Sequence, residues 1–487
     1  MARSSSLTVL SLALTLLVLS PGSLAQSWWP FRQPRRLERG QQALNECNLH
    51  RLSATEPTIR YQWEAGVAEL WDPNQQEFQC TGVTVLRSVI EPRGLLLPHY
   101  VNAPLAFYIV QGNGLLGVTF PGCPETFESG SGSASFSEEG IRGSERTHDK
   151  HQRVRRLRHG DVIAVPAGVN KWVYNDGQEP LVLVAFFDTN SVHNQLDRTL
   201  RKFFLAGNPE QSEGGEGRHH MRGGQEAVTM GNIFKGFDEQ FLADSFGVDR
   251  DTIQRLQGQQ FEGRGGIIRV ERDLQVVCPE YEEEHHHGGR YTMNGLEETF
   301  CSARLGGNVD RPHKADIYNR EGGRLTFLNR NKLPILGLLD MSVDKGHLYQ
   351  NAIMSPHWGI NSHRIHYYTR GRGRVQVTCE RGQLVFDGEV REGQLLVIPQ
   401  NFVVVKQAGQ EGLEWVVFNT HGESMLGTLA GRLSALRALP DEVVMNSYGV
   451  SREDARRLKF SREETHFFQP SSASLRIRQV VEEDVKA

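Results

Sequence analysis

Short apolar runs separated by turn residues dominate the middle of the chain. Residues 105–110 and 115–120 are apolar, branched or aromatic, and Gln-Gly-Asn-Gly at 111–114 separates them. Such a glycine-containing connection between two runs is typical of a β-hairpin. Residues 162–166 and 181–187 are further short runs bounded by Pro, Gly and Asn. Many short strands at this spacing predict a closed barrel or jelly roll.

Helical patterns follow two groups of strands. Asp249 can cap a helix over Arg250–Leu256, and Ser451 can cap one over residues 452–458. The side-chain oxygen of such a residue accepts a hydrogen bond from a free backbone N–H of the first turn. Residues 194–205 and 425–439 also show helical spacing. We therefore expect barrels that are each followed by a short helical extension.

The same sequence blocks occur twice and in the same order. The pairs are 98–100 with 356–358, 111–114 with 370–373, 160–166 with 393–399, 187–189 with 418–420, and 245–250 with 447–452. Five blocks in register indicate a duplicated domain, and a chain of 487 residues has room for two cores. The first copy carries polar insertions at 125–155 and 208–227, and a polar stretch at 279–293 joins the copies. Because these three segments are poor in apolar residues, we expect them to be exposed and largely disordered.

Composition narrows the cellular context and the partners. The chain has 54 basic and 58 acidic residues and a net charge of -4, so it lacks the basic character that nucleic-acid binding demands. An apolar stretch at 7–19 lies in an N-terminal segment, 1–25, with the order of parts of a secretory signal, which predicts cleavage between Ala25 and Gln26. No other apolar run reaches the length of a membrane span, so we expect no membrane partner.

Six cysteines are present, at positions 47, 80, 123, 278, 301 and 379, and none forms a C-x-x-C motif. Disulfides are the expected state in an oxidising lumen, and spacing alone leaves fifteen connectivities open.

Two segments of the first copy, 94–112 and 160–175, resemble the signature motifs of the cupin superfamily, and 393–404 is a fainter second copy. The resemblance implies two tandem cupin barrels, mainly β, of the double-stranded β-helix or jelly-roll type. Metal-dependent cupins hold their metal with three histidines and a glutamate. Here His99 matches the first ligand, whereas Val101 and Lys171 stand at the other histidine positions and 105–107 offers no glutamate.

The second copy departs from that ligand set in the same way. His357 stands alone, with Gly359 and Val404 at the other histidine positions. We therefore expect no metal, no cofactor and no catalysis. His99 and His357 are interpreted as hydrogen-bonded residues near the barrel rim, and Lys171 as a surface cation rather than a base. The run Glu282 to His287 is interpreted as a solvated linker.

The octapeptide at 294–301, Asn-Gly-Leu-Glu-Glu-Thr-Phe-Cys, resembles the junction at which 11S globulin (legumin-like) precursors are cut by a vacuolar asparaginyl endopeptidase. The resemblance implies cleavage between Asn294 and Gly295 into an acidic and a basic chain. It also implies disulfides that join Cys47 to Cys80 and Cys123 to Cys301. Cys278 and Cys379 fall outside this pattern and are either free thiols or a third pair.

Membership of that family implies a seed storage protein. Its precursor would form trimers and, after cleavage, hexamers in the protein storage vacuole, which it reaches through the endoplasmic reticulum. The expected division is a signal peptide at 1–25, a first cupin domain at 26–260, a linker at 261–294 and a second cupin domain at 295–487. Two alternatives stay open: a metal-dependent cupin enzyme of the oxalate oxidase or decarboxylase type, and a metal-free barrel that binds a small molecule.

Overall fold

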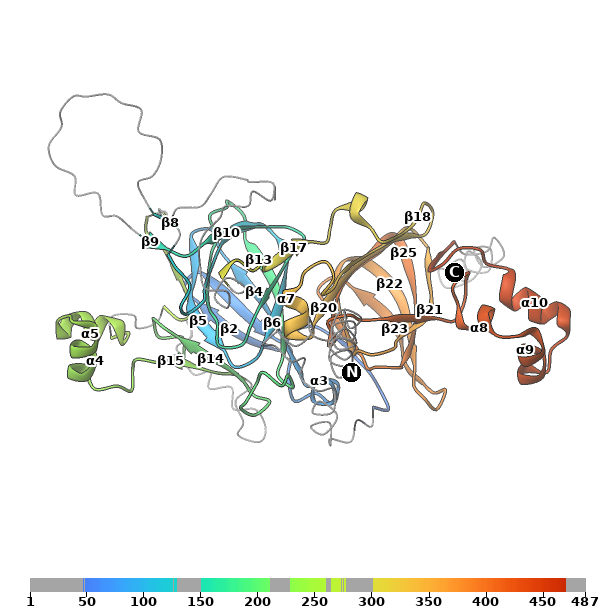
Figure 1. Ribbon diagram of the computed structural model, residues 1–487, viewed down its shortest axis with the longest axis horizontal. Coiled ribbons are helices and arrows are strands. Elements are labelled where there is room, and N and C mark those ends of the chain that lie inside the picture. Colours follow the sequence, from blue (N-terminus) through green and yellow to red (C-terminus); the bar gives the residue numbers. More distant parts are fainter. Residues whose placement is uncertain are drawn as a thin grey trace, which may run out of the picture. The chain divides into compact units, whose positions relative to one another are not determined.

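Mostly antiparallel strands are the main regular structure of the described residues in the computed structural model (Figure 1). The structure describes residues 47, 49–125, 127–128, 150–210, 228–259, 264–272, 274, 276 and 301–469. The predicted signal peptide, the Asn294–Gly295 junction, Cys278, the 279–293 linker and most of the two insertions lie outside these residues. The strands β8 (Phe127–Glu128) and β9 (Lys150–His151) pair with each other within the 125–155 insertion.

Two seven-stranded sheets form the first barrel. One contains β5 (Gly94–Val101), β7 (Asn113–Thr119), β10 (Val154–Arg158), β12 (Asn170–Tyr174), β14 (Leu200–Phe204), β15 (Val228–Asn232) and β16 (Ile267–Arg269). The other contains β2 (Ile59–Trp63), β3 (Gly66–Leu70), β4 (Val83–Ile90), β6 (Leu105–Gln111), β11 (Asp161–Val165), β13 (Leu181–Asp188) and β17 (Gly306–Asn308). The short helix α3 (Gln76–Thr81) precedes β4.

One eleven-stranded sheet forms the second barrel. It contains β1 (Ala54–Thr55), β18 (Ile317–Asn319), β19 (Gly323–Leu328), β20 (Ser342–Leu348), β21 (Ile353–Gly359), β22 (Arg364–Thr378), β23 (Leu384–Arg391), β24 (Leu395–Ile398), β25 (Val403–Asn419), β26 (Leu426–Thr428) and β27 (Phe467–Phe468). The short helices η1 (Pro312–Lys314) and α7 (Ile335–Leu339) lie between its strands in sequence.

The expected hairpin at 105–120 is confirmed as β6 followed by β7, and the runs at 162–166 and 181–187 become β11 and β13. Gly112 lies between β6 and β7 with a φ of 83°, in the left-handed region. A side chain there would be strained and a Cβ would lie 2.7 Å from the Pro180 carbonyl oxygen, so this turn requires glycine.

The helical extensions are confirmed, each as a pair of helices. They are α4 (Glu239–Phe246) with α5 (Arg250–Leu256) in the first copy, and α9 (Asp441–Tyr448) with α10 (Arg452–Phe460) in the second. The side chain of Asp249 accepts from Thr252 N and that of Ser451 from Asp454 N, as the capping argument predicts. The sequence prediction missed α4 and α9.

The prediction of helices at 194–205 and 425–439 is mostly wrong. Residues 200–204 form β14, which joins β5 on one side and β15 on the other. Within the second segment, β26 pairs with β21, and only α8 (Ala435–Ala438) is helical. Backbone pairing with an available sheet edge outweighs a helical pattern this short, because isolated helices of this length are marginal.

Each half of the chain supplies a strand to the other barrel. From the N-terminal half, β1 pairs with β24 of the second barrel, and from the C-terminal half, β17 pairs with β11 of the first. Leu49 and Leu52 also pack in the core of the second barrel. The two halves are therefore interleaved, and the link between them does not depend on chain continuity alone.

The barrels pack through aromatic and charged side chains. The rings of Phe186 and Phe418 stack with their centroids 5.5 Å apart. Lys345 Nζ lies 5.5 Å from the ring centroid of Tyr108 in the other barrel. One hydrophobic cluster contains buried residues of both barrels, including Phe186 and Phe418, and so spans this contact.

The structure changes the alignment of one repeated block, 187–189 with 418–420, by one residue. Asp188 N bonds to the Pro104 carbonyl in the first barrel, and Thr420 N bonds to the His363 carbonyl in the second. Asp188 therefore occupies the place of Thr420, not of Asn419, and Phe186 occupies the place of Phe418. Their matching positions explain why these two phenylalanines meet at the contact between the barrels.

Candidate functional site

The interior of the first barrel holds the histidine that matches the cupin motif. His99 lies on β5, is 2% exposed, and stacks on Phe204 with the ring centroids 5.0 Å apart. Its Nδ1 is 2.9 Å from the Leu97 carbonyl oxygen, which can only accept, so Nδ1 carries the proton. Burial, together with the charges of Lys171 and Lys202, lowers the pKa of His99 well below its ordinary value. His99 is therefore a buried, neutral, hydrogen-bonded imidazole.

Lys171 is not the surface cation that the sequence suggested. It lies on β12 directly opposite His99, is 5% exposed, and its Nζ has no hydrogen-bond partner among the described residues. The neighbouring Trp172 is half-buried and points to the other face of the strand, because side chains alternate across a sheet. Because of this alternation, the Lys171 side chain points into the barrel, whereas the sequence predicted that it would point into solvent.

The second barrel places His357 in the same way. Its Nδ1 is 2.7 Å from the Ser355 carbonyl oxygen, the residue is fully buried, and Val404 lies opposite it. Burial, followed by the charges of Lys406 and Arg364, lowers the pKa of His357 well below its ordinary value. The registers thus put Lys171 and Val404 at the positions where metal-binding cupins use their last histidine.

A buried charge cluster that sequence reasoning missed shares the interior with His357. Arg364 Nη2 donates to Asp344 Oδ2 at 3.1 Å, and Lys406 Nζ donates to His366 Nδ1 at 3.1 Å. Burial raises the pKa of Asp344, and Arg364 opposes that shift. Arg364, His366 and Tyr368 alternate along one face of β22, which could have indicated this cluster. The same alternation of polar residues also fits a strand face exposed to solvent, so the sequence did not distinguish the two.

No group of three or more His, Cys, Asp or Glu side chains capable of holding a metal ion occurs within the described ranges. In the same ranges, no helix is long and apolar enough to cross a membrane. The interiors offer buried cations with one imidazole, His99, in the first barrel and two, His357 and His366, in the second.

Two disulfides join cysteines within the described part of the chain. Cys47 is joined to Cys80 with their Cα atoms 5.0 Å apart, and Cys123 is joined to Cys301 with their Cα atoms 5.4 Å apart. The second bridge links the first barrel to the segment that leads into β17. Cys379 is a half-buried free thiol.

Comparison with known proteins agrees with this architecture. The family model described as Cupin matches residues 51–211 and 307–456. The 11S globulin of Juglans nigra is 46% identical over 506 residues, which cover 96% of this chain and 97% of that protein. Cocosin 1 of Cocos nucifera is 47% identical over 475 residues, which cover 97% and 99%.

Solved structures give the same result. Pumpkin seed globulin has a TM-score of 0.75 at 42% identity and covers 87% of this chain and 100% of its own. An 11S globulin from Wrightia tinctoria, whose structure reveals an auxin binding site, has a TM-score of 0.77 at 41% identity and covers 88% and 97%. The chain therefore belongs to the 11S globulin seed storage proteins, within the cupin family.

Proposed function

We propose that this protein is a nutrient reservoir that stores nitrogen and amino acids in seeds. It would enter the endoplasmic reticulum with removal of residues 1–25, between Ala25 and Gln26, and accumulate in the protein storage vacuole. Relatives that match nearly the whole chain are seed storage globulins, which supports a physical rather than a catalytic role. Packed barrels resist proteases until germination, while polar insertions offer sites for cleavage.

Processing would occur between Asn294 and Gly295, at the end of the proposed 261–294 linker, of which Ile267–Arg269 forms β16 and pairs with β5 of the first barrel. The acidic chain would then contain the first cupin domain, 26–260, and the basic chain the second, 295–487. The observation that carries this proposal is the Cys123–Cys301 disulfide, because Cys301 lies only a few residues beyond Gly295. This bridge would hold the new N-terminus of the basic chain against the first barrel after the cut.

A denaturing gel of protein from mature seed tests the proposal. Without reductant the processed protein should migrate as one unit, and with reductant it should separate into pieces of about 30 and about 20 kDa, from residue counts. Edman sequencing of the smaller piece should begin at Gly295. An Asn294→Gln precursor, offered to asparaginyl endopeptidase, should stay uncut. A different N-terminus, or separation without reductant, would contradict the cleavage site or the disulfide respectively.

Assembly of the precursor into trimers, and of the cleaved protein into hexamers, is part of the proposal. Both helix pairs carry large apolar side chains on their surfaces, among them Phe241 and Phe246 in the first pair and Leu458 and Phe460 in the second. Exposed apolar groups in the matching element of each copy suit contacts with further copies of the chain. The Glu-rich linker, before cleavage, would obstruct the face on which two trimers meet.

A metal-dependent cupin enzyme is the main alternative. It would require the ligands that Val101, Lys171, Gly359 and Val404 replace. Elemental analysis of the purified protein after dialysis against a chelator should find no stoichiometric Mn, Fe, Cu or Zn. About one transition metal per barrel, retained through that dialysis, would favour the enzyme.

A metal-free barrel that binds a small molecule is the second alternative. The auxin binding site of the Wrightia tinctoria protein favours it. Mass spectrometry of protein denatured directly after purification would detect a retained organic ligand, and a stoichiometric one would support this function beside storage.

A further inference from the structure

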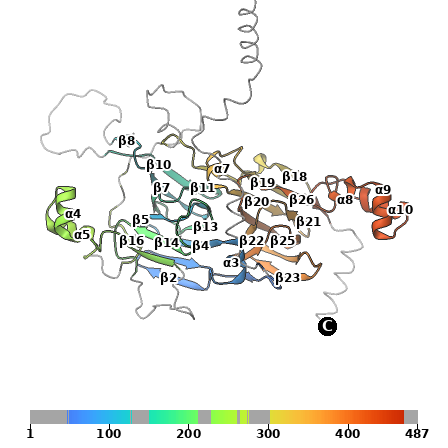
Figure 2. The same cartoon turned by 60° about the horizontal axis from the view of Figure 1, so that its bottom comes forward.

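Lys171 and Lys202 bring two buried ammonium groups into the first barrel. Lys171 on β12 lies opposite His99 on β5, and Lys202 on β14 lies opposite Val101, two residues further along β5. Residues 99 and 101 share one face of their strand, so the two lysines approach His99 from either side (Figure 2 shows β5 and β14 together). Both lysines are 5% exposed.

Among the described residues, no carboxylate is recorded as an ion-pair partner of either lysine. None of the seven strands of their sheet, β5, β7, β10, β12, β14, β15 and β16, contains an aspartate or glutamate. The facing sheet has three, Asp161, Asp188 and Glu69, and each has hydrogen-bond donors elsewhere: Asn308 and Arg158 N for Asp161, Asn190 N for Asp188, and Arg87 for Glu69.

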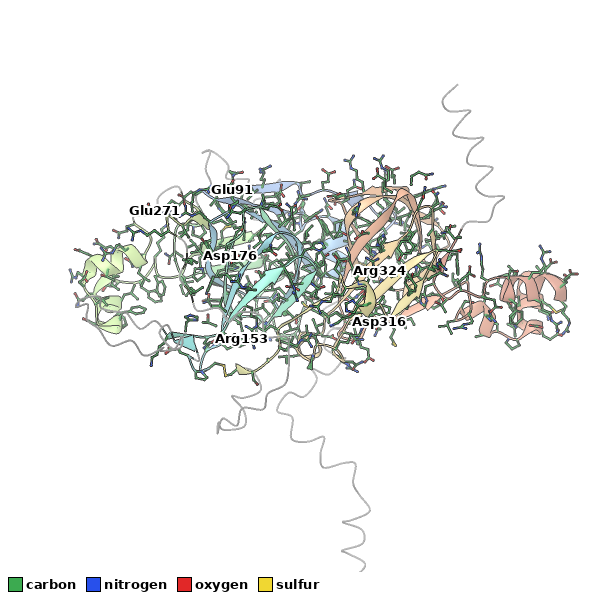
Figure 3. All side chains as sticks on the ribbon, turned by 90° about the horizontal axis from the view of Figure 1, so that it is seen from above. Glu91, Arg153, Asp176, Glu271, Asp316 and Arg324 are labelled. Atoms are coloured by element: carbon green, nitrogen blue, oxygen red, sulfur yellow. A yellow bond between two sulfur atoms is a disulfide. The ribbon has the colours of Figure 1, made fainter. Side chains whose placement is uncertain are left out.

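Glu91, labelled at the edge of the first barrel in Figure 3, is instead partly exposed and pairs with Arg269. A buried charge without a counter-charge is costly, so this arrangement calls for a partner.

In the second barrel, the buried cations Arg364 and Lys406 have partners within the chain. Arg364 is paired with Asp344, and Lys406 bonds to His366 and lies over the ring of Trp415, 4.4 Å from its centroid. At the positions of Lys171 and Lys202 the second barrel has Val404 and Leu426, which lie opposite His357 and Gly359. The fold therefore accommodates apolar residues at both positions, and the lysines of the first barrel are not a structural requirement.

We propose that the first barrel binds a small oxyanion, a carboxylate or a phosphate, between Lys171, Lys202 and His99. The ammonium groups would donate to the oxygens of either anion, and Nε2 of neutral His99 would accept from the protonated oxygen of a hydrogen phosphate. Fully buried side chains such as Phe107 and Phe204 line the same interior, which restricts the ligand to a few atoms. The site is separate from the storage role and does not depend on it.

The titration of the lysines agrees with this assignment. Burial, followed by the charge of Lys202, lowers the pKa of Lys171 to about 7, and burial lowers the pKa of Lys202 to about 8. Lys171 and Lys202 therefore lose protons near neutral pH more readily than exposed lysines do. A bound anion would stabilise their protonated forms. Binding should therefore take up protons and weaken as pH rises through this range.

Calorimetric melting of the full-length protein tests the proposal. After dialysis into a neutral zwitterionic buffer, phosphate or acetate is added while sodium chloride keeps the ionic strength constant. We expect a saturable rise in Tm with at least one oxyanion, because a ligand that binds only the folded state stabilises it. Isothermal titration with the same anion should show about one site per chain.

The decisive variant is Lys171→Val with Lys202→Leu, the residues that the second barrel uses. It should fold and lose the anion-dependent rise. A matched control, Lys235→Val with Lys314→Leu, makes the same charge change at exposed positions and should keep the rise. Should the double variant misfold, Lys171→Met alone should reduce the affinity. An equal rise in both variants, or no rise beyond that in chloride alone, would overturn the proposal.

Discussion

Three histidines, His99, His357 and His366, are buried in the barrels in their neutral form. Burial is the largest cause that lowers the pKa of each one well below its ordinary value. The unfolded chain binds protons at these residues near pH 6.5, whereas the folded chain does not. The free energy of unfolding should therefore fall as pH drops below that value, by up to about 1.4 kcal/mol per pH unit for each histidine.

Urea unfolding between pH 7 and pH 5 checks this expectation. His357→Gln should flatten the pH dependence by up to one proton, whereas His50→Gln, at an exposed position, should leave it unchanged. A His357→Gln protein with the full pH dependence would show that this imidazole is not held neutral by the fold.

Both helix pairs expose large apolar side chains at their surfaces. Phe241 is 73% exposed and Leu458 is 55% exposed, although Leu242, Ala243 and Ile253 form a small core within the first pair. If these side chains hold the proposed trimer together, Phe241→Ser with Leu458→Ser should yield a monomeric precursor in analytical ultracentrifugation. The melting of the monomer should stay cooperative, because neither side chain belongs to a barrel core.

A polar control tests whether that loss is specific. Asp251→Ser with Glu453→Ser changes exposed positions of α5 and α10 and should leave the trimer intact. Dissociation in both variants would mean that the helices respond to general disruption rather than to loss of an apolar contact.

The whole molecule is held together by a covalent and a non-covalent link between its halves. Cys123→Ser removes the disulfide, so the cleaved pieces should separate on a denaturing gel without reductant. Under native conditions they should stay associated, because β17 remains paired with β11 and β1 with β24. Native gel filtration after cleavage would measure this association.

The uncut Cys123→Ser precursor should also lose stability. Removal of a native disulfide usually costs about 2–4 kcal/mol, and this bridge spans 178 residues. Denaturant unfolding of the precursor measures the loss. Cys379→Ser is the matched control, since that cysteine is a free thiol, and it should change stability far less.

The sequence by itself determined the features that depend on local patterns. Alternating apolar runs around glycine turns gave the hairpin at β6 and β7, and the repeated blocks indicated two barrels. Asp249 and Ser451 marked helix starts because capping needs only a side chain and the backbone three residues on. The absent cupin ligands at Val101 and Gly359 could likewise be read from motif spacing.

Tertiary structure decided the features that depend on neighbours distant in sequence. Residues 200–204 are a strand because β5 and β15 flank them, against their own helical spacing. Lys171 is buried because the barrel closes over its face of β12, and β1 and β17 exchange barrels because their pairing partners lie in the other half. Local sequence cannot encode these outcomes, since burial and strand pairing depend on which segments the whole fold brings together.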